Sequence, residues 1–424
     1  MNKPSNNLSG RFLIIWAGQF ISGIGSGLTA FSLGVYAFGK TQSATVYSLI
    51  ILFAFLPSYL LKPLGGTLSD RLDRRLMIII GDLGSAIGLT FILLMFIAGN
   101  HEMWVIYAGV AASSVFVALQ NPAYKASVTD LLSEDGYSKA SGLMQLSESS
   151  RFLISPVIAG FLLHFMQIEQ ILIIDIATFL IAVSAVFVVK KKITAEKYIS
   201  TGESFFSDFV SGFRYTFSHK GLVWLLSVTS IITFAVGFLQ ALMGPMILAF
   251  SDSRTLGIVQ SVSATGMLVS SLLIGIFSKT KRQASVLFLS LAFAGFFYAL
   301  FGTSTSITFI IAAGFLFFCS LPFINTSLEV LIRKNVENKV QGRVWSMVSL
   351  ISQFGMIIAF STAGIMADKI FNPLLQNTGL LASTAGKIVG TGPGRGIGFM
   401  FFMSGLLVIV MAVIIKKSKT IRCY

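Results

Sequence analysis

The chain contains 424 residues, of which 54% are hydrophobic and only 11% are charged, and its formal net charge is +14. A soluble protein of this length would carry about 25% charged residues, so the composition excludes a soluble protein and indicates a polytopic membrane protein. The positive charge, which in a soluble protein would suggest a nucleic-acid partner, is explained here by Lys and Arg residues between apolar segments.

About 12 apolar segments are long enough to cross a bilayer as helices of roughly 20 residues each. They lie near residues 12–38, 44–64, 76–98, 103–124, 140–165, 168–189, 221–249, 255–278, 284–302, 306–332, 341–367 and 396–415. The predicted fold class is therefore an all-α polytopic membrane protein. The polar stretch from Met1 to Arg11 runs directly into the first span, which argues against a cleavable signal peptide.

Lys and Arg residues are distributed unequally between the two sides of these spans. With the N-terminus inside, one side collects most of them, and the other keeps only Lys40, Arg254, Lys369, Lys387 and Arg395. This asymmetry predicts a multi-pass protein of the cell (inner or plasma) membrane with both termini in the cytoplasm.

The first short cytoplasmic loop, Gly65 to Arg75, combines glycines with a dense cluster of charge. Glycine allows close backbone approach, and Asp70 is placed to face a neighbouring helix end. Transfer of a charged side chain into hydrocarbon has a high free-energy cost. The arginines of the loop are therefore expected to stay outside the hydrocarbon; they are Arg71, Arg74 and Arg75. A gating loop and a positive loop that only fixes orientation are both compatible with this pattern.

An internal repeat divides the chain. A shift of 200 residues superposes Pro122 on Pro322, Ser127 on Ser327, Leu131 on Leu331, Lys139 on Lys339 and Gly142 on Gly342. The repeat predicts two six-helix bundles, residues 1–190 and 221–424, which is a transporter architecture with its substrate site between the halves. A degraded copy of the charged loop, at residues 275–283, keeps the basic residues and lacks the aspartate.

Two polar segments interrupt the apolar pattern. The first, residues 191–220, is predicted to be a cytoplasmic linker with an amphipathic helix, because Phe205, Phe209, Phe213 and Phe217 recur at four-residue spacing; a simple tether is the alternative. The second, residues 371–398, is rich in glycine. It has no preceding strand and no Gly-Lys-Ser/Thr, so an outer lid or helix-capping loop is expected in place of a phosphate loop.

The charged loop reads Gly65-x-x-x-Ser69-Asp70-Arg71-x-x-Arg74-Arg75, and this pattern between the second and third spans resembles the signature loop of the major facilitator superfamily. The superfamily usually has glycine where this chain has Asp73, and an aspartate there is similar to the branch of macrolide-efflux proteins and the enterobactin exporter. Residues 15–22, 120–126, 174–180 and 392–396 are similar to that branch too. The resemblance covers essentially the whole chain and implies an exporter that works by alternating access.

Two departures from the family pattern bear on mechanism. Residues 104–118 contain no arginine, although drug/proton antiporters often carry one in the fourth helix. The fifth span has Ser155-Pro156 where the antiporter motif has Gly-Pro, and Gly160 follows. A bend and close packing are expected there.

Ionisable groups within spans are candidates for proton coupling, because each is costly in hydrocarbon. Glu148 and Arg151 lie three residues apart on one helix face, either as a structural salt bridge or as an acid that exchanges its partner for a proton or a cationic substrate. Asp175 is a coupling candidate or a helix-packing residue. Asp82 is assigned to the network of the charged loop. Glu329 is expected to form a gate salt bridge with a basic residue four positions later.

The resemblance implies a substrate cavity lined by the first, fourth, seventh and tenth spans. The polar and aromatic candidates there are Gln19, Ser22, Phe116, Gln120, Phe234, Gln240, Phe315 and Asn325. Aromatic walls with few fixed charges suit large amphipathic ligands, and they equally suit ordinary helix packing.

The three histidines are scattered, and neither a metal-ligand spacing nor a nucleophile constellation is present in the sequence. We therefore expect no enzyme activity, no cofactor, no metal and no nucleic-acid partner. The leading hypothesis is a monomeric, proton-coupled antiporter that exports amphipathic, drug- or macrolide-like small molecules. A dedicated siderophore or natural-product exporter and a transport-inactive membrane sensor are the alternatives.

Overall fold

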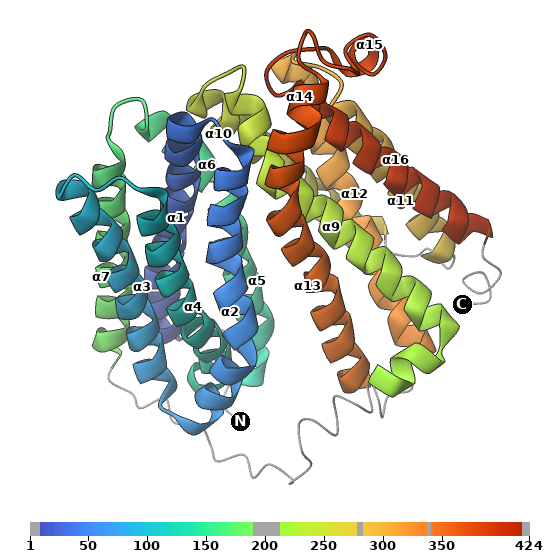
Figure 1. The fold of residues 1–424 in the computed structure, drawn as a ribbon. Coiled ribbons are helices and arrows are strands. Elements are labelled where there is room, and N and C mark those ends of the chain that lie inside the picture. Colours follow the sequence, from blue (N-terminus) through green and yellow to red (C-terminus); the bar gives the residue numbers. More distant parts are fainter. Residues whose placement is uncertain (1–8, 190–212, 278–282, 337–340, 418–424) are drawn as a thin grey trace. The chain divides into compact units, whose positions relative to one another are not determined.

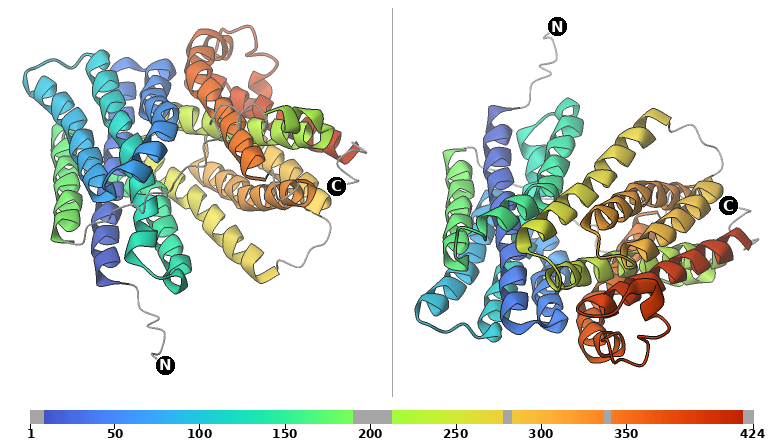
Figure 2. Two further views of the ribbon diagram at one scale, coloured as in Figure 1. Left: turned by 90° about the horizontal axis from the view of Figure 1, so that it is seen from below. Right: turned by 90° about the horizontal axis from the view of Figure 1, so that it is seen from above.

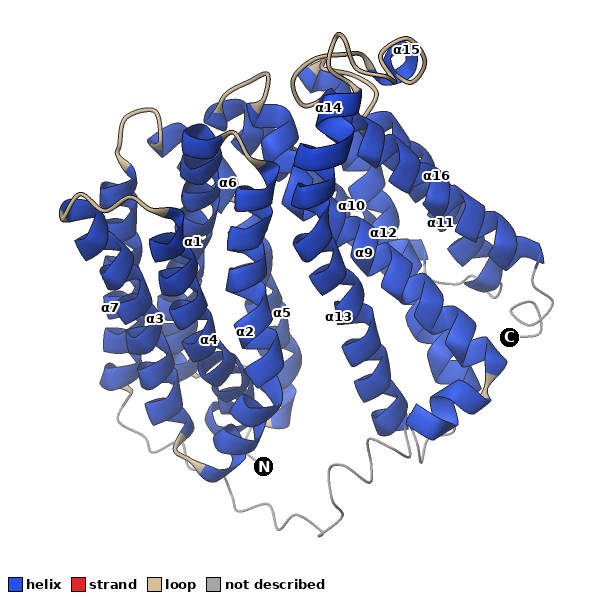
Figure 3. Ribbon diagram, in the orientation of Figure 1, coloured by secondary structure: helices blue, strands red, loops and turns tan. Residues whose placement is uncertain are grey.

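The computed structural model describes residues 9–189, 213–277, 283–336 and 341–417, and within these ranges the chain forms helices, turns and loops without a strand (Figures 1 and 3). Eleven of the described helices are long and apolar enough to cross a membrane. The predicted span at residues 140–165 is not among them, because it is divided into a polar helix and a short apolar one. The prediction of an all-α membrane protein with about 12 spans is confirmed.

The chain forms two compact units, residues 1–41 with 49–199 and residues 42–48 with 200–424. The helices of the first unit are α1 (Gly10–Thr41), α2 (Ala44–Arg71), α3 (Arg74–Ile97), α4 (Met103–Leu131), α5 (Glu134–Leu153), α6 (Ser155–Leu162) and α7 (Ile168–Val188), with α2 entering this unit at Leu49. Those of the second are α9 (Lys220–Leu248), α10 (Ser253–Phe277), α11 (Gln283–Phe301), α12 (Ile307–Asn335), α13 (Gln341–Met366), η1 (Ala367–Phe371), α14 (Asn372–Leu374), α15 (Gly386–Val389) and α16 (Arg395–Lys417).

Each unit packs its helices in a corresponding order. In the first, α3 contacts α4 and α7, and α1 contacts α5. In the second, α11 contacts α12 and α16, and α9 contacts α13. Figure 2 shows the helices from two further directions, coloured along the sequence. Helices that the 200-residue repeat relates therefore have related neighbours.

The predicted boundaries at residues 190 and 220 stay predictions, because residues 190–212 lie outside the described part. Phe205 and Phe209 fall there as well. Residues 213–218 are helical, and the exposed rings of Phe213 and Phe217 lie 4.4 Å apart between centroids.

Glycines on α3 allow α4 to approach closely. A Cβ added at Gly84 would lie 2.2 Å from the ring of Phe116, and one at Gly88 would lie 2.6 Å from the carbonyl oxygen of Gly109. Small residues are what lets membrane helices pack backbone to backbone. Phe116, a candidate for the cavity wall, is therefore engaged in ordinary packing between α3 and α4.

The fifth span breaks at Ile154, between α5 and α6. Pro156 at the start of α6 has no N–H for the preceding turn, and Ser155 is buried and donates to the carbonyl oxygen of Ile24 at 3.0 Å. A Cβ at Gly27 would lie 2.4 Å from the Ser155 hydroxyl, so α1 packs directly on the break. Gly160 is buried one turn further on.

The glycine-rich segment at residues 371–398 folds as short helical turns around one buried cation. Arg395 donates to the carbonyl oxygens of Val389, Ser304 and Gly302, the last two at 3.1 and 2.6 Å. It is only 2% exposed. Gly394 adopts φ of +73°, a conformation that favours glycine. The segment is thus an ordered loop that the hydrogen bonds of Arg395 hold in place.

Candidate functional site

The charged loop is shorter than the sequence suggested. Helix α2 continues to Arg71 and α3 begins at Arg74, which leaves only Leu72 and Asp73 between them. The side chain of Asp73 accepts a hydrogen bond from the backbone N–H of Arg75 at 2.9 Å and so caps α3. Aspartate is among the best residues for that position, which gives a physical reason for an aspartate here.

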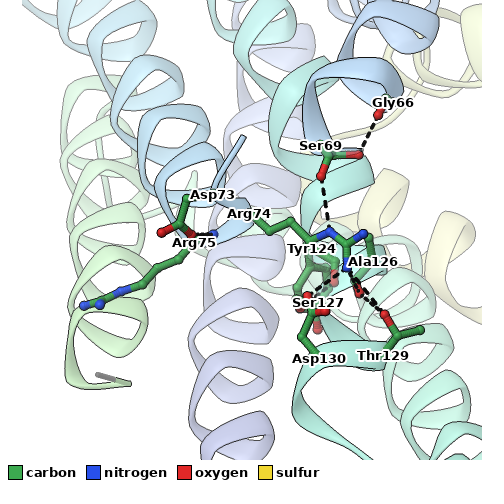
Figure 4. Close-up of polar contacts among 10 residues, drawn as sticks. All are labelled: Gly66, Ser69, Asp73, Arg74, Arg75, Tyr124, Ala126, Ser127, Thr129 and Asp130. Carbon is green, nitrogen blue, oxygen red and sulfur yellow. Dashed lines mark hydrogen bonds and ion pairs between the residues drawn. The ribbon is translucent and has the colours of Figure 1, made fainter. Parts of the chain in front are cut away.

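Arg74 ties the start of α3 to the end of α4. Its guanidinium donates to the carboxylate of Asp130 at 2.8 Å and to the carbonyl oxygen of Ala126 at 3.1 Å (Figure 4). The Nε atom also donates to the carbonyl oxygen of Ser69 in α2 at 3.2 Å. One side chain therefore joins three helices of the first unit, and a charge-assisted pair of this kind is stronger than a neutral one.

Arg75 points the other way and caps α7. It donates to the carbonyl oxygens of Val186 and Phe187 at 3.1 and 2.8 Å, and its guanidinium lies 5.7 Å from the Phe187 ring centroid. A cation at a helix C-terminus satisfies carbonyl groups that have no partner within the helix and interacts favourably with the helix dipole.

The remaining residues of the loop are placed as follows. Gly65 lies inside α2, where an added Cβ would lie 2.0 Å from the carbonyl oxygen of Ala118 in α4. Arg71 is exposed at the end of α2. The backbone of Asp70 belongs to the last turn of α2, and its side chain lies outside the described residues. The predicted role of Asp70 stays a prediction.

Three polar side chains from three helices meet inside the first unit. Gln120 of α4 donates to the side-chain oxygen of Gln19 in α1. Gln19 in turn donates to the carboxyl group of Asp82 in α3 at 2.7 Å. Asp82 is 2% exposed and Gln19 is 8% exposed. The sequence assigned Asp82 to the network of the charged loop, whereas the hydrogen bond that the structure gives its carboxyl group comes from Gln19, a residue predicted to line the cavity.

A second buried carboxyl group, that of Asp175 in α7, lies against α1. It is 1% exposed and accepts hydrogen bonds from the hydroxyls of Thr178 and Ser26 at 3.3 and 3.5 Å. A Cβ at Gly25 would lie 2.7 Å from its Oδ1 atom, so the backbone of α1 closes over it. Arg151 interacts with it electrostatically.

Glu148 and Arg151 do not form the buried pair that the sequence suggested. Glu148 pairs with Lys125 of α4 at 3.0 Å, and the two side chains are 52% and 58% exposed. Arg151 is exposed too, and it interacts electrostatically with both Glu148 and Asp175. The physical reason is that α5, up to the break at Ile154, is a largely polar helix with few buried positions.

Glu329 pairs with Arg333 at 2.5 Å within α12, and both side chains are about half exposed or more. The pair has i,i+4 spacing in one helix, so it stiffens that helix and does not itself join two elements.

The other cavity candidates vary in exposure. Ser22 is buried in α1, and Gln240 and Asn325 are exposed on α9 and α12. Phe234 is half-buried, and its ring centroid is 5.2 Å from that of Phe238; Phe315 is half-buried in α12. Four of the eight candidates, including these two aromatics, belong to the second unit.

Sequence reasoning missed several partners that complete these contacts. Asp130, Lys125 and Ser26 were not singled out, although each lies on a helix already implicated. The recurrence of charge at the predicted cytoplasmic end of the fourth span was the available signal for the first two.

Repeated helical units, a charged loop and buried carboxyl groups define a multi-pass membrane protein with the features of a transporter. The chain belongs to the Major Facilitator Superfamily, whose family model matches residues 15–360. The resemblance to this superfamily is thereby confirmed, and the resemblance to its macrolide-efflux branch is confirmed by macrolide efflux protein A, which is 25% identical over nearly the whole chain.

The relatives agree with this assignment. Macrolide efflux protein A of Streptococcus pyogenes is 25% identical and the alignment covers 98% of each chain. Multidrug resistance protein 2 of Bacillus subtilis is 23% identical over 87% of this chain and 91% of its own. Among solved structures, the nucleoside transporter NupG superposes with a TM-score of 0.77 at 15% identity and covers 97% of this chain and all of its own, which shows a shared fold.

Proposed function

We propose that the protein is a secondary active transporter that exports amphipathic small molecules by alternating access, coupled to inward movement of protons. The observation that carries the proposal is the similarity to macrolide efflux protein A along 98% of both chains. Residues 1–190 and 221–424 are the two halves that would rock against each other in such a cycle.

Asp82 is the first residue that we assign to proton coupling. Its carboxyl group lies within a transmembrane helix and receives its hydrogen bond from the neutral amide of Gln19. An amide carries both a donor and an acceptor. It can therefore donate to a carboxylate or, when the amides of Gln19 and Gln120 both rotate, accept from a carboxylic acid. The Gln19 amide thus serves either protonation state, and Gln120 connects it to α4.

Asp175 is the second candidate, because hydroxyl groups share this property. Ser26 and Thr178 can each donate to the ionised form or accept from the protonated form. Arg151 interacts electrostatically with Asp175 and with Glu148. An exposed carboxylate that already has a Lys125 partner is a weaker choice for a proton carrier than a buried one, so Glu148 ranks third.

The test is accumulation of a panel of labelled macrolides and other amphipathic compounds in cells that lack their own exporters. Expression of the parental protein should lower accumulation of part of the panel, and a protonophore should restore it. The Asp82→Asn variant should lose most of its proton-coupled transport, because an amide cannot take up and release a proton at this position. Glu148→Gln, at an exposed site with similar isosteric change, should keep most of it.

Each outcome has a defined meaning. Uncoupler-sensitive transport by Asp82→Asn at the parental rate would remove Asp82 from coupling. Transport of only one chemically narrow compound would favour a dedicated siderophore or natural-product exporter. Unchanged accumulation across the whole panel, with the protein present in the membrane, would contradict drug export and favour the transport-inactive sensor.

A further inference from the structure

The glycine-rich segment at residues 371–398 presents two large apolar side chains at its surface. Leu380 is 86% exposed and Ile388 is 54% exposed. The turn that carries Leu380 is fixed, because the N–H of Leu381 donates to the carbonyl oxygen of Leu374 at 3.0 Å and the N–H of Gly386 donates to that of Leu381 at 2.9 Å. A single exposed leucine needs no partner, so the surroundings of the segment decide what these side chains contact.

The segment rests on the first turns of α16. Its small core consists of Leu375, Ala385 and Val389, and this core packs against Phe399 and Phe402 of that helix. Figure 1 shows the corresponding elements, α14 and α15, at the end of α16 where the helix begins. The segment is therefore seated on one face of α16.

The same face of α16 is apolar and exposed further along the helix. At 3.6 residues per turn, the positions that follow Phe402 on this face are Leu406, Val410 and Val413, and all three are exposed. An exposed face of a membrane-spanning helix that carries only apolar side chains is typical of contact with lipid hydrocarbon. The segment is thus continuous with a lipid-facing stripe.

The depth of the segment follows from the length of α16. A hydrocarbon core is about 30 Å thick, which corresponds to about 20 residues of α-helix. Counted back from Lys416, which is exposed at the predicted cytoplasmic end, that length reaches Gly396, and α16 begins at Arg395. Phe399 and Phe402 therefore lie within the hydrocarbon, and the segment that packs on them lies at the level of the lipid headgroups.

The charges of the segment fit a phospholipid surface as well. From Lys369 to the last residue, Tyr424, the chain contains neither aspartate nor glutamate. Lys387 is exposed and lies next to Ile388 in α15. A lysine can bury its aliphatic stem along apolar surface and keep its ammonium group in the polar layer, where the phosphates of the lipids lie.

We propose that the glycine-rich segment is a lipid-binding element, which inserts Leu380 and Ile388 into the bilayer on the predicted outer side and pairs Lys387 with a phospholipid phosphate. The hydrogen bonds of Arg395 to Val389, Ser304 and Gly302 hold the segment in this position. Such binding involves the second unit alone and does not depend on drug export.

Fluorescence quenching by lipid tests this placement. Leu380→Cys or Ile388→Cys is introduced with Cys319→Ser and Cys423→Ser, labelled with an environment-sensitive fluorophore and reconstituted in vesicles of phosphatidylcholine and phosphatidylglycerol. Replacement of these lipids by forms brominated on the acyl chains should remove most of the fluorescence at both positions. Asn377→Cys, at an exposed polar position of the same segment, is the matched control and should keep most of its fluorescence.

The contact with phosphate is tested in the labelled Leu380→Cys protein. Lys387→Glu places an acid beside the phosphates and should reduce the quenching, because like charges repel. Lys387→Arg keeps the positive charge and should retain the quenching.

Quenching at positions 380 and 388 that does not exceed that at position 377 would overturn the insertion. Blue-shifted emission without quenching would overturn it too, and would indicate that a protein surface such as a second copy of the chain covers the segment. Equal quenching in Lys387→Glu and Lys387→Arg would overturn the phosphate contact.

Discussion

Buried carboxyl groups and exposed ion pairs are separated clearly at the level of single residues. Asp82 and Asp175 are fully buried among neutral donors, whereas Glu148 and Glu329 pair with cations at the surface. Exposed pairs of the second kind contribute about 0–1 kcal/mol to stability. Among these four acids, burial has a high free-energy cost only for the two aspartates, so they are the ones that call for a functional explanation.

Asp70→Asn is expected to leave membrane insertion intact and to impair transport. The arginines of the loop are sufficient to orient the chain, and they are unchanged in this variant. Quantitative blotting of membranes gives insertion, and compound accumulation gives transport. Transport at the parental rate would reduce Asp70 to a residue without a role in the cycle.

Arg75→Ala is expected to lower stability by about 2–4 kcal/mol, because two hydrogen bonds from a charged donor are worth about 1.5–3 kcal/mol each before partial exposure reduces them. Both bonds go to carbonyl groups at the end of α7. Thermal unfolding of the purified protein in detergent measures the change. Arg71→Ala, at an exposed position in the same loop, is the matched control and should unfold with the parental protein.

At the level of elements, the ends of helices and their partners were the features that sequence could not supply. Apolar runs located the spans because hydropathy is a property of each segment alone. The apolar run of the second predicted span ended at residue 64, whereas α2 continues to Arg71. The helix extends further than the run because charged side chains are tolerated where a helix emerges from the bilayer. The contact between Gln19 and Asp82 joins residues 63 positions apart, and no local pattern encodes it.

Gly88→Leu is expected to separate α3 from α4. An added Cβ already lies 2.6 Å from a carbonyl oxygen, and overpacking of this type costs about 1–3 kcal/mol or more. Yield of folded protein and thermal unfolding measure the effect. Gly66→Ala, at a helical glycine with nothing within 4 Å of the added Cβ, should be neutral or slightly stabilising. Equal losses in both variants would contradict the packing role.

Asp252 precedes α10 and caps it. Its carboxylate accepts from the backbone N–H of Thr255 at 2.8 Å, and the hydrogen bonds from Thr255 lower the pKa of Asp252 below its ordinary value. A lowered pKa means that this stabilisation is present above the unfolded-state pKa and is lost as the pH falls through the folded-state pKa. Asp252→Ala should therefore be less stable than the parent at pH 7, and the difference should narrow toward pH ~3. A difference that is constant with pH would contradict the assignment.

At the level of the whole molecule, the internal repeat was readable from sequence and the site was only partly readable. Five matches at one fixed spacing were enough to indicate duplication, and each unit packs related helices in the same order. The candidates for the cavity were chosen by residue type, and residue type does not distinguish Phe116, which packs between two helices, from a residue that faces a ligand.

Both termini are predicted to lie in the cytoplasm, on the basis of the distribution of Lys and Arg. A reporter that is active only inside the cell should function when fused after Tyr424, and a reporter that is active only outside should function within residues 376–384. The reverse pattern would invert the assignment and with it the sidedness of the charged loop.

The glycine notches between α3 and α4 also bear on how the protein is made. The two helices are joined by a turn of a few residues, Ala98 to Glu102, and they fit together at Gly84 and Gly88. Once α4 has been synthesised and inserted into the bilayer, α3 and α4 can therefore associate before any later helix has been made. The chain thus carries, in its first half, a self-complementary hairpin on which the helices synthesised afterwards can assemble.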